Sequence, residues 1–253
     1  DTNGSVSFEV SGFQDGNNNV GNTSTAVTDT SSVTIDTTLP TLSKVVMTSS
    51  NILNNSLAKS GETVTLDISV NEHINTPSIS FSSDNQTITG PITITGENDS
   101  YTAQFGVNAS DKDGPVSFTI SNISDLAGNV LSDVTALTSG TTVTIDKTAP
   151  SLSTVTLQSN NIENTDSAKS GDSVELTIIA NEDITTPQVQ ITSGDVSVNN
   201  AISVDGTGQN YTASYTVSSS DVSGSVAFII ENYTDLAGNA GPTVKTTTDS
   251  SNV

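Results

Sequence analysis

The sequence repeats itself at an offset of 110 residues, and this repeat constrains the fold more than any other feature. Residues 31–40 read SSVTIDTTLP and residues 141–150 read TTVTIDKTAP. When residues 39–143 are laid on 149–253 without a gap, 42 of the 105 positions are identical. We therefore expect residues 1–38 to be the C-terminal part of a preceding repeat, 39–148 a complete repeat, and 149–253 a repeat that ends just before its C-terminal linker.

Within each copy, apolar residues alternate with polar ones at a period of two, which is the pattern of strands with one buried face. The clearest alternations of the first complete copy are Val64, Leu66, Ile68 and Val70; Tyr101, Ala103, Phe105 and Val107; and Val116, Phe118 and Ile120. Clusters of Ser, Thr, Asn and Gly separate the alternating segments, and no long stretch has the helical period. The sequence predicts an all-β chain of antiparallel β-sandwiches, each of about 100 residues and about seven strands.

Charge and composition exclude several classes of protein. The chain has 28 acidic and 6 basic residues, a formal net charge of -22, and no Cys. Such a polyanion cannot neutralise phosphates, so nucleic acid is excluded as a partner, and an anionic membrane surface would repel it. No apolar run is long enough for direct insertion into a membrane. Without Cys there is no disulfide framework, thiol nucleophile or Cys-ligated zinc.

Two motifs in combination carry a resemblance to a known family. DLAGN at residues 125–129 is followed by VTIDKTAP at residues 143–150, and the first motif recurs at residues 235–239. The chain resembles the bacterial immunoglobulin-like tandem repeats of large cell-surface adhesins. The resemblance implies a linear array of seven-stranded immunoglobulin-like sandwiches, secretion to the bacterial cell surface, and calcium at the joints between domains. The first copy departs from the motif, because it reads Asp15-Gly-Asn-Asn-Asn19, and we expect a more flexible loop there.

If the strands run A to G in immunoglobulin order, the acidic residues gather at the joints. Ca²⁺ takes six to eight oxygen ligands, and clustered carboxylates repel one another unless a cation separates them. For the joint between the complete copies we expect metal ligands from Asp111, Asp113, Asp146, Glu182, Asp183, Asp235 and Asn239, with Glu62 nearby. For the preceding joint the equivalent set is Asp1, Asp36, Glu72, Asp125 and Asn129.

A structural interpretation of the same residues stays open beside calcium. An Asp at the start of a turn commonly accepts hydrogen bonds from its own backbone, and Gly128 or Asn129 supplies the positive φ of a tight turn. None of the clusters has the spacing of an EF-hand loop.

Nothing in the sequence indicates an enzyme. His73 is the single histidine, and no nucleophile or orienting partner is singled out beside it. Asp111 and Asp113 resemble a glycosidase pair only in spacing, because a sugar cleft needs aromatic side chains and the chain has no Trp.

The leading functional hypothesis is a non-catalytic stalk, an extender segment of an adhesin outside the cell, whose partners are the neighbouring repeats of the same long chain. The first alternative is a subunit of a surface layer, sheath or extracellular filament, in which other copies make lateral contacts. The second alternative is a ligand-binding module that uses loops at a free pole. Residues 1–38 are either the visible end of a longer chain, which we favour, or strands that complement another molecule.

Overall fold

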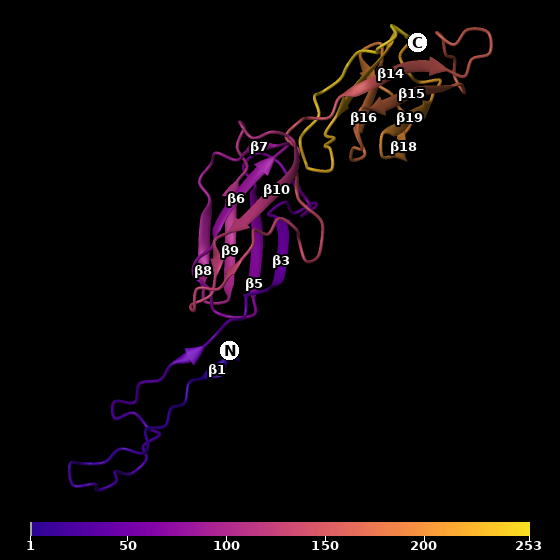
Figure 1. Cartoon of the computed structure of the whole chain (residues 1–253). Helices are drawn as coiled ribbons and strands as arrows, with labels where there is room; N and C mark the ends of the chain where they lie inside the picture. Colours follow the sequence, from indigo (N-terminus) through magenta and orange to yellow (C-terminus); the bar gives the residue numbers. More distant parts are fainter. Residues whose placement is uncertain (1) are drawn as a thin grey trace.

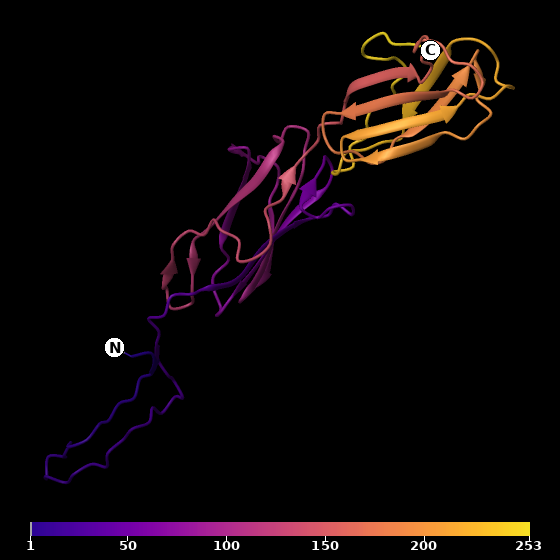
Figure 2. The same ribbon diagram turned by 90° about the vertical axis from the view of Figure 1, so that its right-hand side faces the viewer.

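The computed structural model describes residues 2–253, and regular secondary structure in that range consists of strands alone. Residues 2–38 form a narrow ribbon in which the chain runs out and folds back on itself. One β-sandwich follows the ribbon and a second follows the first, so the three parts lie in line (Figures 1 and 2). Within residues 2–253, no helix has the length and hydropathy needed to cross a bilayer. The all-β prediction is confirmed.

The first sandwich begins with a four-stranded antiparallel sheet whose fully buried residues are all apolar or aromatic. The strands lie in the order β3 (Leu42–Ser49), β5 (Thr63–Val70), β9 (Ser100–Gly106) and β8 (Thr93–Glu97). In β5 the buried residues alternate with half-buried polar ones, as the period of two predicts.

The second sheet of this sandwich has five strands. It contains, in order, β4 (Leu57–Ala58), β13 (Thr144–Ile145), β10 (Gly114–Ser121), β6 (Ser78–Ser83) and β7 (Gln86–Thr87). The pair of β4 and β13 is parallel, which is the exception to the antiparallel prediction. It brings the segment after β3 beside the strand that leads into the next linker.

The core lies between the two sheets. Val64, Leu66 and Ile68 of β5 are at most 1% exposed. The rings of Phe81 and Phe105, one from each sheet, have their centroids 4.9 Å apart and join the layers. Burial of alternate residues explains how a chain with only 32% hydrophobic residues forms cores, because the outward faces consist mainly of Ser and Thr.

The second sandwich repeats the first at the offset of the sequence. Its four-stranded sheet has the order β14 (Leu152–Ser159), β15 (Ser173–Ala180), β19 (Asn210–Thr216) and β18 (Ser203–Thr207). The facing sheet has the order β17 (Val196–Ser197), β16 (Gln188–Ser193) and β20 (Val226–Glu231). Tyr101 and Tyr211 are buried at equivalent positions, and each hydroxyl donates to a backbone carbonyl, of Ile74 and Ile184 respectively.

The N-terminal ribbon is held by β1 (Gly4–Ser5) and β2 (Thr34–Ile35) together with isolated bridges. Its apolar side chains are exposed, with Val6 at 51% and Phe8 at 41%. The amide of Val6 donates to the carbonyl of Val33, just as Val116 donates to Val143 in the first sandwich. The ribbon therefore has the pairing of β10 with β13 without a facing sheet.

Candidate metal centres at the joints

Two groups of three carboxylates lie at the ends of the sandwiches. One joins Asp36, Glu72 and Asp125, and the other joins Asp146, Glu182 and Asp235. In each group one ligand atom per residue can be chosen so that all lie within 4.8 Å of one another. The two groups are related by the repeat offset, and each combines a linker residue, a residue that follows the second long strand, and the first residue of the DLAGN turn.

A small hairpin builds the turn that carries Asp125. The flanking strands are β11 (Ile123–Ser124) and β12 (Val130–Leu131). Asp125 Oδ1 accepts hydrogen bonds from the amides of Gly128 (2.7 Å) and Asn129 (2.8 Å), and Gly128 has φ +94°. The turn needs a residue that tolerates this φ, which glycine does at no steric cost.

Asn129 ties the linker to the turn. Its Nδ2 donates to Asp125 Oδ2 at 2.7 Å and to the backbone carbonyl of Asp36 at 3.2 Å. Asn239 does the same for Asp235 (2.8 Å) and the carbonyl of Asp146 (3.0 Å). The two asparagines therefore donate through their amide nitrogen and orient the carboxylates.

Asp125 thus accepts hydrogen bonds from the backbone of its own turn, as the structural interpretation of the sequence expects. Asp15, in the copy without Leu and Ala, accepts from the amide of Asn17 and from the amide and side chain of Asn19, and Asn18 has the positive φ of 64°, so the bonds between Asp and the last Asn do not need Leu and Ala. Asp125 Oδ1 accepts two hydrogen bonds, whereas Oδ2 accepts one and keeps a second lone pair for a cation.

Electrostatics differ among these carboxyls. Hydrogen bonds from the Asn129 side chain and from the turn amides lower the pKa of Asp125. Burial, and then the nearby carboxylates of Asp235 and Asp113, raise the pKa of Asp146. Burial also raises the pKa of Glu182, with Asp146 and Asp235 adding to the effect. Negative charge at the joint between the sandwiches is therefore not compensated by the protein.

The residues fit a hard divalent cation. Among residues 2–253, the two ion pairs are Lys44 with Asp67 and Lys147 with Asp113, so neither involves a member of the two groups. Each group offers three carboxylate oxygens within 4.8 Å of one another, which is the donor type that Ca²⁺ prefers. Asp36, Glu72 and Asp125 would hold one ion, and Asp146, Glu182 and Asp235 would hold the other.

Other predicted ligands do not join these groups. Asp111 is buried and caps its own turn by accepting from the amide of Asn108, because that turn leaves the amide without another partner. Asp113 accepts from the amide of Lys147 (3.1 Å) and the hydroxyl of Thr148 (2.7 Å). Burial raises the pKa of Asp113, but these bonds and the charge of Lys147 outweigh it and leave the pKa lowered.

The remaining predicted residues lie around the groups. Asp183 is exposed and lines the same hollow as Asp146 and Glu182, outside the three-carboxylate group. Glu62 accepts from the amide of Lys59 and so caps the turn before β5. Asp1 lies outside the described residues.

Comparison with known proteins finds similarity among solved structures only. No protein-family model matches the chain, and no curated protein matches it. Among solved structures, the I-band fragment I67-I69 from titin is similar over 84% of this chain and 65% of its own length, at 14% identity and a TM-score of 0.41. The full ectodomain of mouse nectin-like molecule 4 is similar over 89% and 71%, at 16% identity and a TM-score of 0.36. Both values are low, so the fold rests on the sheets themselves.

In the first sandwich, β3, β5, β9 and β8 correspond to strands A, B, E and D of an immunoglobulin domain. The facing sheet has β6 and β10, the strands C and F, at its centre, and this order decides the architecture. The chain is a tandem of immunoglobulin-like sandwiches. With β4 as the strand that pairs in parallel with the last strand, the first immunoglobulin-like sandwich has the arrangement A′-G-F-C-C′ in its second sheet.

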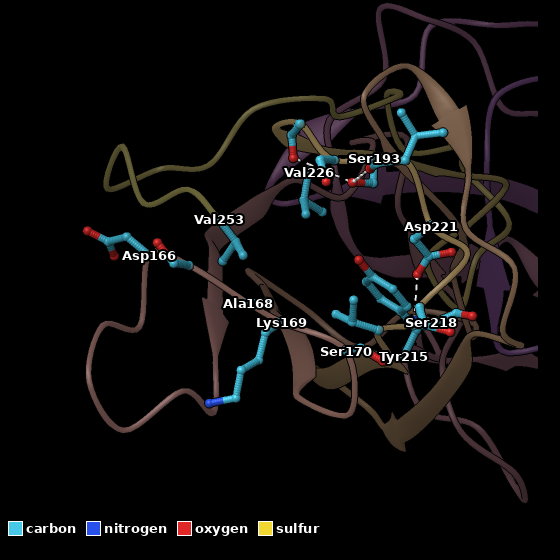
Figure 3. Close-up of a pocket in the computed structure, with 16 residues that line it drawn as sticks. Asp166, Ala168, Lys169, Ser170, Ser193, Tyr215, Ser218, Asp221, Val226 and Val253 are labelled. Atoms are coloured by element: carbon cyan, nitrogen blue, oxygen red, sulfur yellow. Dashed lines mark hydrogen bonds between the residues drawn. The ribbon is translucent and has the colours of Figure 1, made fainter.

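A hollow of about 480 Å³ lies at the far end of the second immunoglobulin-like sandwich (Figure 3). It is lined by Ala168, Tyr215, Asp221 and Val226, among others. In the first sandwich β13 pairs with β4 and β10 at the equivalent place, whereas the described part of the second sandwich has no strand there. The hollow is the position of a strand and has no features of a small-molecule site.

Sequence reasoning missed two residues at the joint between the sandwiches. Asn51 and Lys59 of the first sandwich donate hydrogen bonds to the backbone carbonyls of Ala237 and Gly238 in the second. The available signal was the recurrence of the same residue types at Asn161 and Lys169. A residue that recurs outside the strand alternation points to a role other than the core.

Proposed function

We propose that the chain is a non-catalytic stalk segment of a large secreted bacterial cell-surface adhesin, stiffened by calcium at its joints. The observation that carries the proposal is the pair of three-carboxylate groups, one at each joint. In each group the linker, which holds Asp36 or Asp146, meets two loops of the sandwich that follows. A cation bound there ties the linker to the sandwich and restricts bending.

The shape and surface support an extender. The sandwiches follow one another in line, and the outward strand faces are rich in Ser and Thr (Figure 2). Like charges keep copies apart in solution, which suits a spacer rather than a lattice. In this proposal the partners are the neighbouring repeats of the same long chain, outside the cell, without nucleic acid and without insertion into the membrane.

The domain boundaries belong to the same proposal. Residues 39–148 and 149–253 are two immunoglobulin-like repeats, and residues 1–38 are the C-terminal part of a preceding one. The match between the Val6–Val33 and Val116–Val143 hydrogen bonds supports this assignment of the ribbon.

Calorimetric titration of the full chain with calcium, after treatment with chelator, tests the proposal. We expect two sites per chain and a higher midpoint of thermal unfolding, because a ligand at about 100 times its Kd stabilises the native state by about 2.7 kcal/mol. Asp146→Asn combined with Glu182→Gln should remove one site. Asp166→Asn, which alters an exposed carboxylate outside both groups, is the matched control.

Two outcomes would count against the proposal. An absence of binding heat together with an unchanged unfolding midpoint would remove calcium from it. Sheets or fibres formed in calcium would replace the stalk with the lattice or filament alternative, since a stalk stays monomeric.

A further inference from the structure

Two side chains of the first sandwich cross the joint and contact the second sandwich directly. Asn51 Nδ2 donates to the carbonyl of Ala237 at 2.8 Å, and Lys59 Nζ donates to the carbonyl of Gly238 at 2.7 Å. Both donors come from the segment between β3 and β5, and neither belongs to the carboxylate groups. These contacts join the sandwiches without an ion.

Both donors are held in place before they meet their acceptors. Asn51 is 5% exposed, and its Oδ1 accepts from the amides of Leu53 (2.8 Å) and Asn54 (3.1 Å), which fixes the direction of the amide nitrogen. Lys59 directly follows β4, whose Ala58 carbonyl accepts from the amide of Asp146. Lys59 is thus held beside β13, the strand that leads into the linker, because β4 pairs with β13.

The acceptors are shaped for close approach. Ala237 is 0% exposed, and Gly238 has φ +86°. A Cβ atom at Gly238 would lie 2.9 Å from Lys59 Nζ and 3.1 Å from Leu53 Cδ1. A side chain at Gly238 would therefore have to displace the ends of Lys59 and Leu53, and it would also be strained at this φ.

The equivalent turn of the first sandwich has a different environment. Ala127 is exposed, and a Cβ at Gly128 would meet nothing within 4 Å. Conversely, Asn161 and Lys169 lie at the far end of the second sandwich, and their side-chain nitrogens donate no hydrogen bond to any residue in 2–253. The side chain of Lys169 extends away from its neighbours (Figure 3). The turn at Gly128, which has no such donors, and the pair Asn161 and Lys169, which has no such turn, thus lie at opposite ends of the tandem.

We propose that the Asn and Lys of this segment form a two-donor latch that recognises the backbone carbonyls of a DLAGN-type turn in an adjoining immunoglobulin-like sandwich. Asn51 and Lys59 form the latch closed on Ala237 and Gly238. Asn161 and Lys169 present the same surface to a partner of this chemistry, an immunoglobulin-like domain with a DLAGN turn. The latch operates without a cation, so it stands whether or not the joints bind calcium.

Energy transfer between two dyes on the full chain tests the latch. Because the protein has no Cys, Gln104→Cys and Glu175→Cys place one exposed label on each sandwich. In chelator, Asn51→Ala combined with Lys59→Met should broaden the distribution of inter-dye distances by roughly twofold, because two hydrogen bonds across the joint are lost. Asn161→Ala combined with Lys169→Met is the matched control and should leave the width unchanged.

The outcomes separate the latch from calcium and from unfolding. An unchanged width in the latch variant, or equal broadening in the control, would overturn the proposal. Glu182→Gln in chelator removes a repelling charge and should not broaden the distribution, so a failed calcium site cannot imitate a failed latch. If the double variant does not give the circular dichroism of the native chain, Lys59→Met alone, which leaves the buried Asn51 in place, must still broaden the distribution.

Discussion

The joint before the first sandwich and the joint between the two sandwiches share their local chemistry and differ in their surroundings. Both have a linker Asp, a Glu, a turn Asp and a turn Asn at equivalent positions. At the joint between the sandwiches, Asn51 and Lys59 also cover the turn. The two carboxylate groups are equally buried, but the turn beside them is exposed at one joint, the open joint, and covered at the other, the enclosed joint.

The enclosed joint changes the acidity of its carboxyls. Burial and mutual repulsion raise the pKa of Asp146 and Glu182, whereas at the other joint the hydrogen bonds from Asn129 and the turn lower the pKa of Asp125. The turn hydrogen bonds act on Asp125, and burial with the neighbouring carboxylates acts on Asp146 and Glu182.

The largest expected effect comes from removing the turn carboxylate at the enclosed joint. Asp235→Ala leaves the amides of Asn239 without their acceptor, and such losses in a buried turn cost about 2–4 kcal/mol in the free energy of unfolding. Chemical denaturation measures the loss. Asp125→Ala removes the same bonds at the open joint, and we expect it to leave the contacts between the sandwiches unchanged. A broader inter-dye distribution in Asp125→Ala would contradict this separation.

A smaller effect should distinguish the two turn glycines. Gly128→Val and Gly238→Val both place a branched residue at positive φ, which costs about 1–3 kcal/mol. Only Gly238→Val should also displace Lys59 and Leu53, and so only this variant should broaden the distance distribution between the sandwiches. Denaturation and energy transfer on the same pair measure both parts. Equal behaviour of the two variants in both measurements would show that the enclosed turn has no special contact.

The smallest effect is a dependence on pH in the absence of calcium. The folded pKa values of Asp146 and Glu182 lie above their ordinary values of 3.8 and 4.5, so in that window the native state binds more protons than the unfolded one. The joint between the sandwiches should weaken as the pH rises from about 4 to neutral, since the carboxylates then repel one another.

The opposite sign holds for Asp125. Its lowered pKa stabilises the folded chain at pH values above the ordinary pKa of Asp, and this stabilisation is lost as the pH falls through the pKa of the folded state.

Energy transfer across the enclosed joint at several pH values, with Asp146→Asn as control, measures the effect of Asp146 and Glu182. If the distribution stays constant in the unsubstituted chain, the carboxylates of this joint do not repel one another as the structure implies.

Much of the fold was predictable from local pattern. The alternation at Val64, Leu66 and Ile68 gave the buried face of β5, because side chains of a strand point alternately to its two faces. The alternation at Val143 and Ile145 predicted β13, but its parallel pairing with β4 was not predictable, since the two residues of β4 form no recognisable pattern.

The candidate site was predictable in part. Asp146, Glu182 and Asp235 come together as the loop assignment predicted, and so do Asp36, Glu72 and Asp125. Asp111 and Asp113 stay outside the three-carboxylate group, which the sequence did not reveal because it assigns a residue to a loop but does not give its hydrogen bonds. In the structure these two carboxylates are engaged by Asn108, Lys147 and Thr148.

The sequence by itself determined the repeat, the strands with one buried face, and the turn chemistry of Asp125 and Asn129, because all three depend on residues that are near one another in the chain. Tertiary structure decided which carboxylates meet, which turn is covered, and that Asn51 and Lys59 contact Ala237 and Gly238. The contacts of Asn51 and Lys59 join residues 186 and 179 positions apart, and only the packing of one sandwich on the next brings them within hydrogen-bond distance.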